Sequence, residues 1–256
     1  MKKNRITITG ERLFKDNLPR GLKIPTDAFR LRMLKEYGAV FTAKGGAVLP
    51  NKIVFKDEAE VSDFQTSVAR AKENIGGFEL ELQAPAMKSL IAAIKEAAQN
   101  DLAITPRGAD SAKRSYTETV ELWASRVNPG LAHWVETGKL SAIEAAKIRC
   151  LSPFEQVPKI LALESEGLFF SKDLSKTIVY SVAPPGTSQH LSMLAFDACE
   201  HENPTVREIL ARHGWLQTVI SDLPHFTFLG VTENKLDDSG LKKVIDGERV
   251  FWLPAF

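Results

Sequence analysis

The sequence has few cysteines, no long apolar run and no excess of one charge, and each absence excludes a class of protein. Two cysteines, Cys150 and Cys199, are too few for a fold held together by disulfides. No run of about 18 apolar residues is present, so we expect no transmembrane segment. The formal net charge is +1, which gives no indication of a nucleic-acid or anionic-membrane partner. What remains is a globular protein with 44% hydrophobic residues.

The two cysteines and the first residues bear on export. One bridge between Cys150 and Cys199 would suit an exported protein, but we expect two unlinked, buried thiols. Met1–Arg5 is basic, as at the start of a signal peptide, whereas Ile6–Gly10 is too short and polar for the apolar region that should follow. The expected location is therefore the periplasm or the extracellular space if a leader is missing from this chain, and the cytoplasm otherwise.

The chain length suits one large domain or a domain with an appendage. We expect residues 1–75 to be an N-terminal extension of unknown role, and residues 76–256 to form the domain that carries the chemistry. The extension contains two strand-like stretches, Gly38–Phe41 and Ala47–Phe55.

Periodicity and capping residues predict several helices in the second part. Apolar residues recur every three or four positions in Met87–Ala98, and Asp110 or Ser111 is placed to cap the next helix. Further predicted helices begin at Ser141, at Ser152 (ended by Gly167) and at Asn203 (ended by Gly214).

Short apolar or β-branched runs predict the strands, which are Leu102–Thr105, Thr177–Val182, the segment around Asp197, and His225–Phe228. In the last of these, alternation places His225 on one face and the phenylalanines in the core. The expected fold class is α+β, with a small antiparallel sheet and helices packed on it.

Three residues in this predicted sheet region have the order and setting of a catalytic zinc site: His190, Asp197 and His225. Zinc enzymes commonly hold the metal with three nitrogen or oxygen side chains and leave a fourth position open. Asp197 stands in an otherwise apolar strand, where a carboxylate is costly to bury unless it is paired or binds a metal. The alternatives are a salt bridge to a buried arginine for Asp197 and a surface-loop position for His190.

The spacing S-x-H-x(6)-D followed by D-x-x-H resembles that of the zinc D-alanyl-D-alanine carboxypeptidases and dipeptidases of cell-wall metabolism. That family also includes phage L-alanyl-D-glutamate endopeptidases. Ser188, His190, Ala195 and Asp197 match the first motif, and Asp222 and His225 match the second, but Met193 replaces the family glycine. Ser111–Tyr116 is similar to the family's S-G-x-R-S segment. The resemblance covers roughly residues 85–230.

The resemblance implies a role for each matched residue. His190, Asp197 and His225 would bind one zinc ion, and Asp222 would be the catalytic base, unless it only caps a turn. Arg114 would bind the substrate or polarise the scissile carbonyl, with Arg107 as its rival. Ser188 or Gln189 would contact the substrate or orient Asp197.

These roles together predict a zinc-dependent peptidase that hydrolyses peptidoglycan stem peptides at a bond involving a D-amino acid. Both a carboxypeptidase and an endopeptidase fit the motifs. One alternative is an inactive module that keeps the zinc fold and binds cell-wall peptides. The other is a globular protein without metal, in which the spacing is a coincidence.

Overall fold

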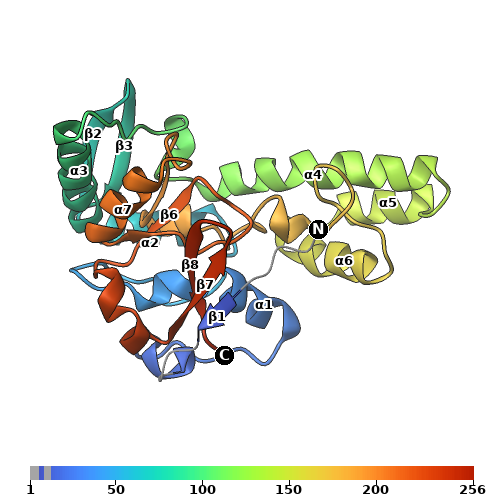
Figure 1. Cartoon of the computed structure of the whole chain (residues 1–256). Coiled ribbons are helices and arrows are strands. Elements are labelled where there is room, and N and C mark those ends of the chain that lie inside the picture. The colour runs from blue at the N-terminus through green and yellow to red at the C-terminus, as the bar shows by residue number, and fades with distance from the viewer. Residues whose placement is uncertain (1–5, 9–12) are drawn as a thin grey trace. The chain divides into compact units, whose positions relative to one another are not determined.

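The computed structural model in Figure 1 describes residues 6–8 and 13–256, so the basic start Met1–Arg5 lies outside the described residues. Contacts divide the chain into two compact units. Unit 1 comprises the described residues of Met1–Ile53, Asp63–Arg114 and Gln189–Phe256, and unit 2 comprises Val54–Ser62 and Ser115–Ser188. The expected boundary at residue 75 falls inside a hairpin of unit 1, and the separate role of residues 1–75 stays a prediction.

The central sheet of unit 1 has the order β4-β6-β5 and is antiparallel throughout. Its strands are β4 (Ala195–Asp197), β5 (Trp215–Leu216) and β6 (His225–Phe228). The register places Asp197 directly opposite His225, so two of the expected ligands face each other across one strand pair. The predictions of a strand at Asp197 and of a strand at His225–Phe228 are both confirmed.

Helices pack around this sheet, which confirms the α+β fold class. The helix predicted at Met87–Ala98 is α3 (Ala84–Gln99), which packs on α7 (Pro204–Arg212) and on the hairpin of β2 (Arg70–Ile75) and β3 (Phe78–Gln83). The side chain of Asn203 accepts from the backbone of Thr205 and Val206, as its predicted capping role requires.

The rest of unit 1 comes from the two ends of the chain. β1 (Ile6–Ile8) pairs with β7 (Leu241–Asp246), which forms a hairpin with β8 (Arg249–Pro254). α1 (Ala28–Tyr37) packs against β8. The backbone N–H of Trp252 donates to the carbonyl of Gln217 at 2.9 Å, which ties the β7–β8 hairpin to the chain that follows β5.

Unit 2 is helical, with α4 (Tyr116–Glu136), α5 (Ala142–Arg149) and α6 (Pro153–Ser165) side by side in Figure 1. The caps predicted at Ser141 and Ser152 are confirmed. The cap predicted at Asp110 or Ser111 is wrong, because Ser115 caps α4 and residues 109–111 form the short 3-10 helix η3 (Ala109–Ser111). α2 (Glu58–Ser67) connects segments of both units.

Three predicted strands are wrong, because these segments form 3-10 helices or loops instead of an extended strand. Gly38–Phe41 lies in the 3-10 helix η2 (Gly38–Thr42), and Thr177–Val182 contains the 3-10 helix η4 (Ile178–Tyr180). The buried carboxylate of Glu164 accepts from the N–H of Ile178 and so holds this turn. Ala47–Phe55 contains no strand. Short apolar runs indicate burial more reliably than they indicate an extended backbone.

The segment predicted as a strand at Leu102–Thr105 runs beside β4 without joining the sheet as a strand. Its carbonyl at Thr105 accepts from the N–H of Cys199 at 2.9 Å, and Pro106 forms a single bridge with Ala198. Proline has no N–H to continue a ladder, which accounts for the isolated bridge.

Two further expectations concern cysteine and the membrane. Cys150 and Cys199 are unlinked, as predicted, but both are exposed, so the prediction of buried thiols is wrong. In the described part of the chain, no helix combines the length and the apolar character needed to cross a bilayer.

Candidate metal centre

The three expected ligands come together in one buried cluster. His190 lies in the 3-10 helix η5 (Gln189–Ser192), Asp197 ends β4 and His225 begins β6. The exposed fractions are 1% for His190, 7% for Asp197 and 4% for His225. One ligating atom from each lies within 4.8 Å of the other two, so the cluster can hold a metal ion.

The ligating atoms form a nearly equilateral triangle. His190 Nε2 lies 3.2 Å from His225 Nδ1 and 3.2 Å from Asp197 Oδ1, and the third side, His225 Nδ1 to Asp197 Oδ1, is 3.1 Å. In a tetrahedral site with ligands about 2.0–2.1 Å from zinc, two ligand atoms lie about 3.3–3.4 Å apart. The triangle therefore fits three corners of a zinc tetrahedron after movements of a few tenths of an ångström.

Hydrogen bonds on the outer side of each ring determine which nitrogen faces the triangle with a lone pair. His190 Nδ1 is 2.7 Å from the carbonyl of Ala112, which can only accept, so this nitrogen carries the proton. His225 Nε2 is 2.9 Å from Gln189 Oε1 and by the same argument donates to it. In the neutral rings, His190 Nε2 and His225 Nδ1 then have no proton, and both direct lone pairs at Asp197 Oδ1.

The orientation of the Gln189 amide is itself fixed from the other end. Its Nε2 donates to the backbone carbonyl of Tyr37 at 2.7 Å, so its Oε1 must face His225. Thr227 also donates to this oxygen. Tyr37 ends α1 within the predicted extension, so a residue of that region helps to set the tautomer of His225, a candidate ligand. Gln189 is buried and contacts His225 rather than Asp197, and its contact with a substrate stays a prediction.

The pKa directions agree with a cluster that attracts a cation. Burial lowers the pKa of His190, in spite of the opposing charge of Asp197, so the ring is neutral and able to bind a metal. Burial alone would raise the pKa of Asp197, whereas positive charge or N–H donors at His190 and His225 would hold the pKa of this carboxyl well below its usual value. With both rings neutral, a metal cation would supply that positive charge. Two ring nitrogens and one carboxylate oxygen thus face one another with lone pairs. A metal cation between these three atoms would remove their mutual repulsion.

Arg114, one of the two candidate arginines, contacts this cluster. Its Nη2 donates to Asp197 Oδ2 at 2.8 Å, while Asp197 Oδ1 belongs to the triangle. Its Nε donates to the carbonyl of Asp110 at 2.9 Å. Arg107 has an exposed side chain and only its backbone N–H reaches the carbonyl of Asp197. In this conformation Arg114 orients the carboxylate of Asp197, and its contact with a substrate stays a prediction.

The remaining predicted site residues, Asp222 and Ser188, lie outside the triangle. Asp222 is exposed, and its carbonyl accepts from the N–H of His225 in the turn that leads into β6. Its carboxylate is therefore in solvent, and the residue precedes the candidate ligand His225 by three positions in the sequence. Ser188 is buried and is the last residue of unit 2. The roles of both residues stay predictions.

Met193, which stands where the resembled motif has glycine, adopts a backbone conformation that favours glycine. Met193 has φ +55°, in the left-handed region that glycine adopts without strain. Its N–H donates to the carbonyl of His190, and its carbonyl accepts from the N–H of Gln83. The chain thus turns at Met193 between the first ligand and β4, as a glycine would allow, and Met193 keeps this conformation with a fully buried side chain.

Sequence reasoning missed the groups that orient the ligands. The carbonyls of Ala112 and Tyr37 are backbone atoms and have no sequence signature. Thr227 could have been found, because it lies two residues after His225 on the same face of a strand.

Comparison with known proteins gives little beyond this geometry. No family model matches the chain, and no curated protein matches it. Among solved structures, the chain is similar to the crystal structure of a mutant of VanY, a vancomycin-resistance D,D-pentapeptidase from a VanB-type resistance cassette, in complex with Zn(II). The identity is 16%, the match covers 66% of this chain and 85% of that chain, and the TM-score is 0.39.

Proposed function

We propose that this chain is a zinc-dependent peptidase that hydrolyses peptidoglycan stem peptides at a bond involving a D-amino acid. The observation that carries the proposal is the buried His190–Asp197–His225 triangle, in which hydrogen bonds direct the ring lone pairs of both histidines toward Asp197 Oδ1. Three protein ligands leave a fourth tetrahedral position for water or substrate, which is the usual arrangement of catalytic rather than structural zinc. The sequence motifs supply the substrate class.

Each residue then has a defined task. Zinc, when bound, supplies a Lewis acid and lowers the pKa of water to about 7. Asp222 accepts the proton of the attacking water and passes it to the leaving amine. Its exposed position leaves the carboxylate able to turn toward a bound peptide. Arg114 holds Asp197 in place through Oδ2 and, with its remaining N–H groups, binds a substrate carboxylate or the scissile carbonyl.

The experiment is digestion of defined stem peptides by zinc-loaded protein, with products identified by mass spectrometry. Release of a terminal D-Ala would identify a carboxypeptidase, and cleavage between L-Ala and D-Glu would identify an endopeptidase. We expect Asp222→Asn, which keeps the side-chain volume but not the base, to lower the rate by about 10²–10⁴-fold with zinc content unchanged. Asp63→Asn, at another exposed aspartate in unit 1, is the matched control and should cleave normally.

The results also separate the rival function. The exposed position of Asp222, outside the ligand cluster, favours an inactive zinc module as the second candidate. Zinc protein that binds the peptides and cuts none would establish that module. Cleavage by Asp222→Asn within a few-fold of wild type would remove Asp222 from the mechanism and leave it as a turn residue.

A further inference from the structure

Arg107 stands in line with two of the candidate metal ligands. Pro106 forms an antiparallel bridge with Ala198. One position further along, the N–H of Arg107 donates to the carbonyl of Asp197 at 3.2 Å, so these two residues lie opposite each other. Opposite residues share a face of the sheet, which puts Arg107 on the face that carries the Asp197 side chain. Since His225 is the partner of Asp197 on the other side, the three residues form a row across β4 and its neighbours.

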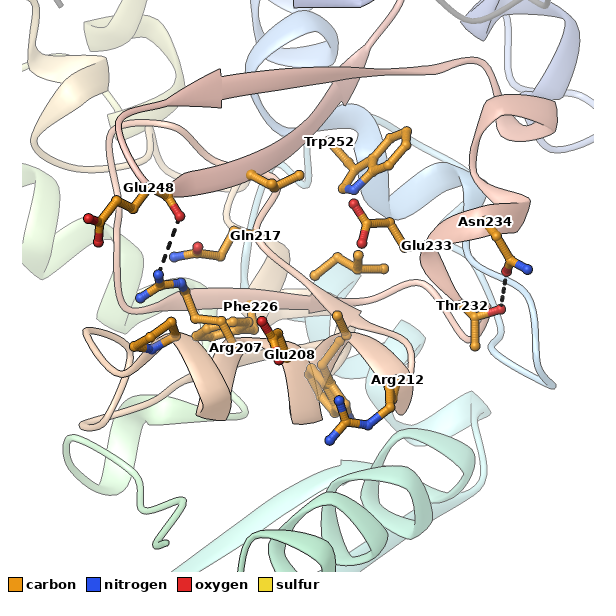
Figure 2. A pocket seen from close by; sticks show the side chains of 15 residues that line it. Arg207, Glu208, Arg212, Gln217, Phe226, Thr232, Glu233, Asn234, Glu248 and Trp252 are labelled. Carbon is orange, nitrogen blue, oxygen red and sulfur yellow. Dashed lines mark hydrogen bonds between the residues drawn. The ribbon is translucent and has the colours of Figure 1, made fainter. Parts of the chain in front are cut away.

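Three other arginines of unit 1 are held by protein groups, whereas the guanidinium of Arg107 is free. Arg114 donates to the carboxylate of this row at 2.8 Å. Arg207, which Figure 2 shows in the wall of a cavity, and Arg249 both donate to the carbonyl of His201 at 3.0 Å. Within residues 6–8 and 13–256, the exposed guanidinium of Arg107 makes no hydrogen bond or ion pair. It is therefore available to an anionic group of a substrate.

The candidate base Asp222 lies in the same neighbourhood as Arg107. Burial lowers the pKa of His201, and the charges that act on this ring include those of Arg107, which lowers its pKa, and Asp222, which raises it. Both side chains are exposed, and all three residues belong to unit 1. A peptide that reaches Asp222 therefore comes close to the free guanidinium as well.

The two bonds considered for the peptidase share one feature on the side of the leaving amine. In D-Ala-D-Ala, the residue that leaves carries a free α-carboxylate. In L-Ala-D-Glu the same holds, because the stem peptide continues through the side-chain carboxyl of D-Glu. In both substrates, one carbon separates the scissile nitrogen from this carboxylate. Either substrate, when bound at the metal cluster, therefore brings an anion close to the ligand row.

We propose that Arg107 binds the α-carboxylate of the residue that follows the scissile bond. This inference rests on the proposed peptidase function and names the group by which that site selects its substrate. The planar guanidinium donates two parallel N–H bonds to the two carboxylate oxygens, which gives orientation as well as attraction. Arg114 remains with Asp197 and the scissile carbonyl. Peptides without a free carboxylate at this position are poor substrates.

The test compares three forms of the pentapeptide L-Ala-γ-D-Glu-L-Lys-D-Ala-D-Ala with zinc-loaded full chain. One form has both α-carboxylates free, one is amidated at D-Glu and one is amidated at the C-terminus. Mass spectrometry identifies the bond that is cut, and initial rates give kcat/KM. In wild type, amidation of the residue that follows the cut bond should lower kcat/KM by about 10–100-fold, and the other amidation should have little effect.

Substitution of Arg107 should remove this discrimination. Arg107→Gln should lower kcat/KM for the free acid by about the same 10–100-fold, mainly through KM, and amidation should then cause no further loss. Arg107→Lys should lie between, because it keeps the charge but not the planar pair of donors. Arg212→Gln is the matched control, since Arg212 is another exposed arginine of unit 1, and it should keep the full penalty of amidation. Zinc content and thermal unfolding verify that each variant is folded.

The outcomes separate this inference from the peptidase function. Arg107→Gln with an undiminished penalty of amidation would overturn the inference and assign the carboxylate to Arg114 or another group. Equal cleavage of acid and amide by wild type would overturn it too. If wild type cuts neither bond, the peptidase function fails, and calorimetric affinities for the three peptides test Arg107 by themselves. A loss of affinity on amidation that Arg107→Gln abolishes would support its role, and equal affinities or no binding would refute it.

Discussion

The two faces of β6 differ in how their polar groups are satisfied. On the face of His225 and Thr227, each side chain donates to Gln189, whose far end is tied to Tyr37. On the face of Phe226 and Phe228, the neighbouring Trp215 packs its ring on Phe228 with centroids 5.3 Å apart, but its N–H has no partner in the described part of the chain.

This difference separates a polar face of β6, which carries a candidate metal ligand, from an apolar face that packs in the core. In the His190–Asp197–His225 cluster every candidate ligand has an orienting hydrogen bond. In a metal site such bonds fix the orientation of the ligands and raise metal affinity. On the back face, which is the face of Phe226 and Phe228, the packed aromatic rings leave the indole N–H of Trp215 without a partner among the described residues. A change on one face should therefore alter one property and leave the other, and the variants below test this separation.

The largest effect is expected for His225→Ala on the metal face. Removal of one of three ligands should abolish stoichiometric zinc binding, because two ligands form no comparable site. In wild type, zinc at about 100 times its dissociation constant should stabilise the fold by about 2.7 kcal/mol, and the variant should lose this gain. Metal analysis and thermal unfolding with and without zinc measure both quantities. A full equivalent of zinc in this variant would show that the ligand assignment is wrong, and His213→Ala serves as the histidine control.

The next largest effect is expected for Phe226→Ala on the back face. It should lower the stability of the fold and leave zinc binding unchanged. Phe226 is 1% exposed, and removing a buried phenylalanine costs about 3–5 kcal/mol. Urea unfolding should show this loss, while the folded variant should still bind one equivalent of zinc. Phe226→Leu should lose less stability, since it leaves a smaller cavity. Zinc affinity that falls in parallel with stability would contradict the separation of the two faces.

A smaller effect is expected for Gln189→Ala, which removes the acceptor of His225 Nε2 without removing a ligand. Loss of such an orienting group typically lowers metal affinity by about 10–100-fold. Competition with a zinc chelator measures this change. Gln156→Ala is the matched control, because Gln156 is also buried and bonded to a ring N–H but lies in unit 2. Equal zinc affinity in the two variants would leave Gln189 with a packing role only.

The smallest effect isolates the backbone at Met193. Both Met193→Ala and Met193→Gly remove the buried side chain and should destabilise the protein. Only glycine relieves the left-handed conformation, so Met193→Gly should be more stable than Met193→Ala by about 1 kcal/mol. Denaturant midpoints of the two variants give this difference directly. If alanine is the more stable residue, the turn does not hold its φ of +55° in solution.

Elements with local signals were predictable, and elements that depend on distant partners were not. Asn203, Ser141 and Ser152 cap helices as predicted, because a cap involves atoms only two or three residues away. Thr177–Val182 has the composition of a strand but forms a turn, because the distant Glu164 takes the N–H of Ile178.

The same distinction applies to the metal centre. The sequence by itself determined the residue types and order of His190, Asp197 and His225. The side-chain types that bind zinc and the alternation of residues along a strand can both be recognised in a short stretch of sequence. Only the tertiary structure decided which nitrogen of each ring faces the cluster, because that choice depends on carbonyls at Ala112 and, through Gln189, at Tyr37. It also decided the attachment of the C-terminal hairpin, because the N–H of Trp252 donates to the carbonyl of the distant Gln217.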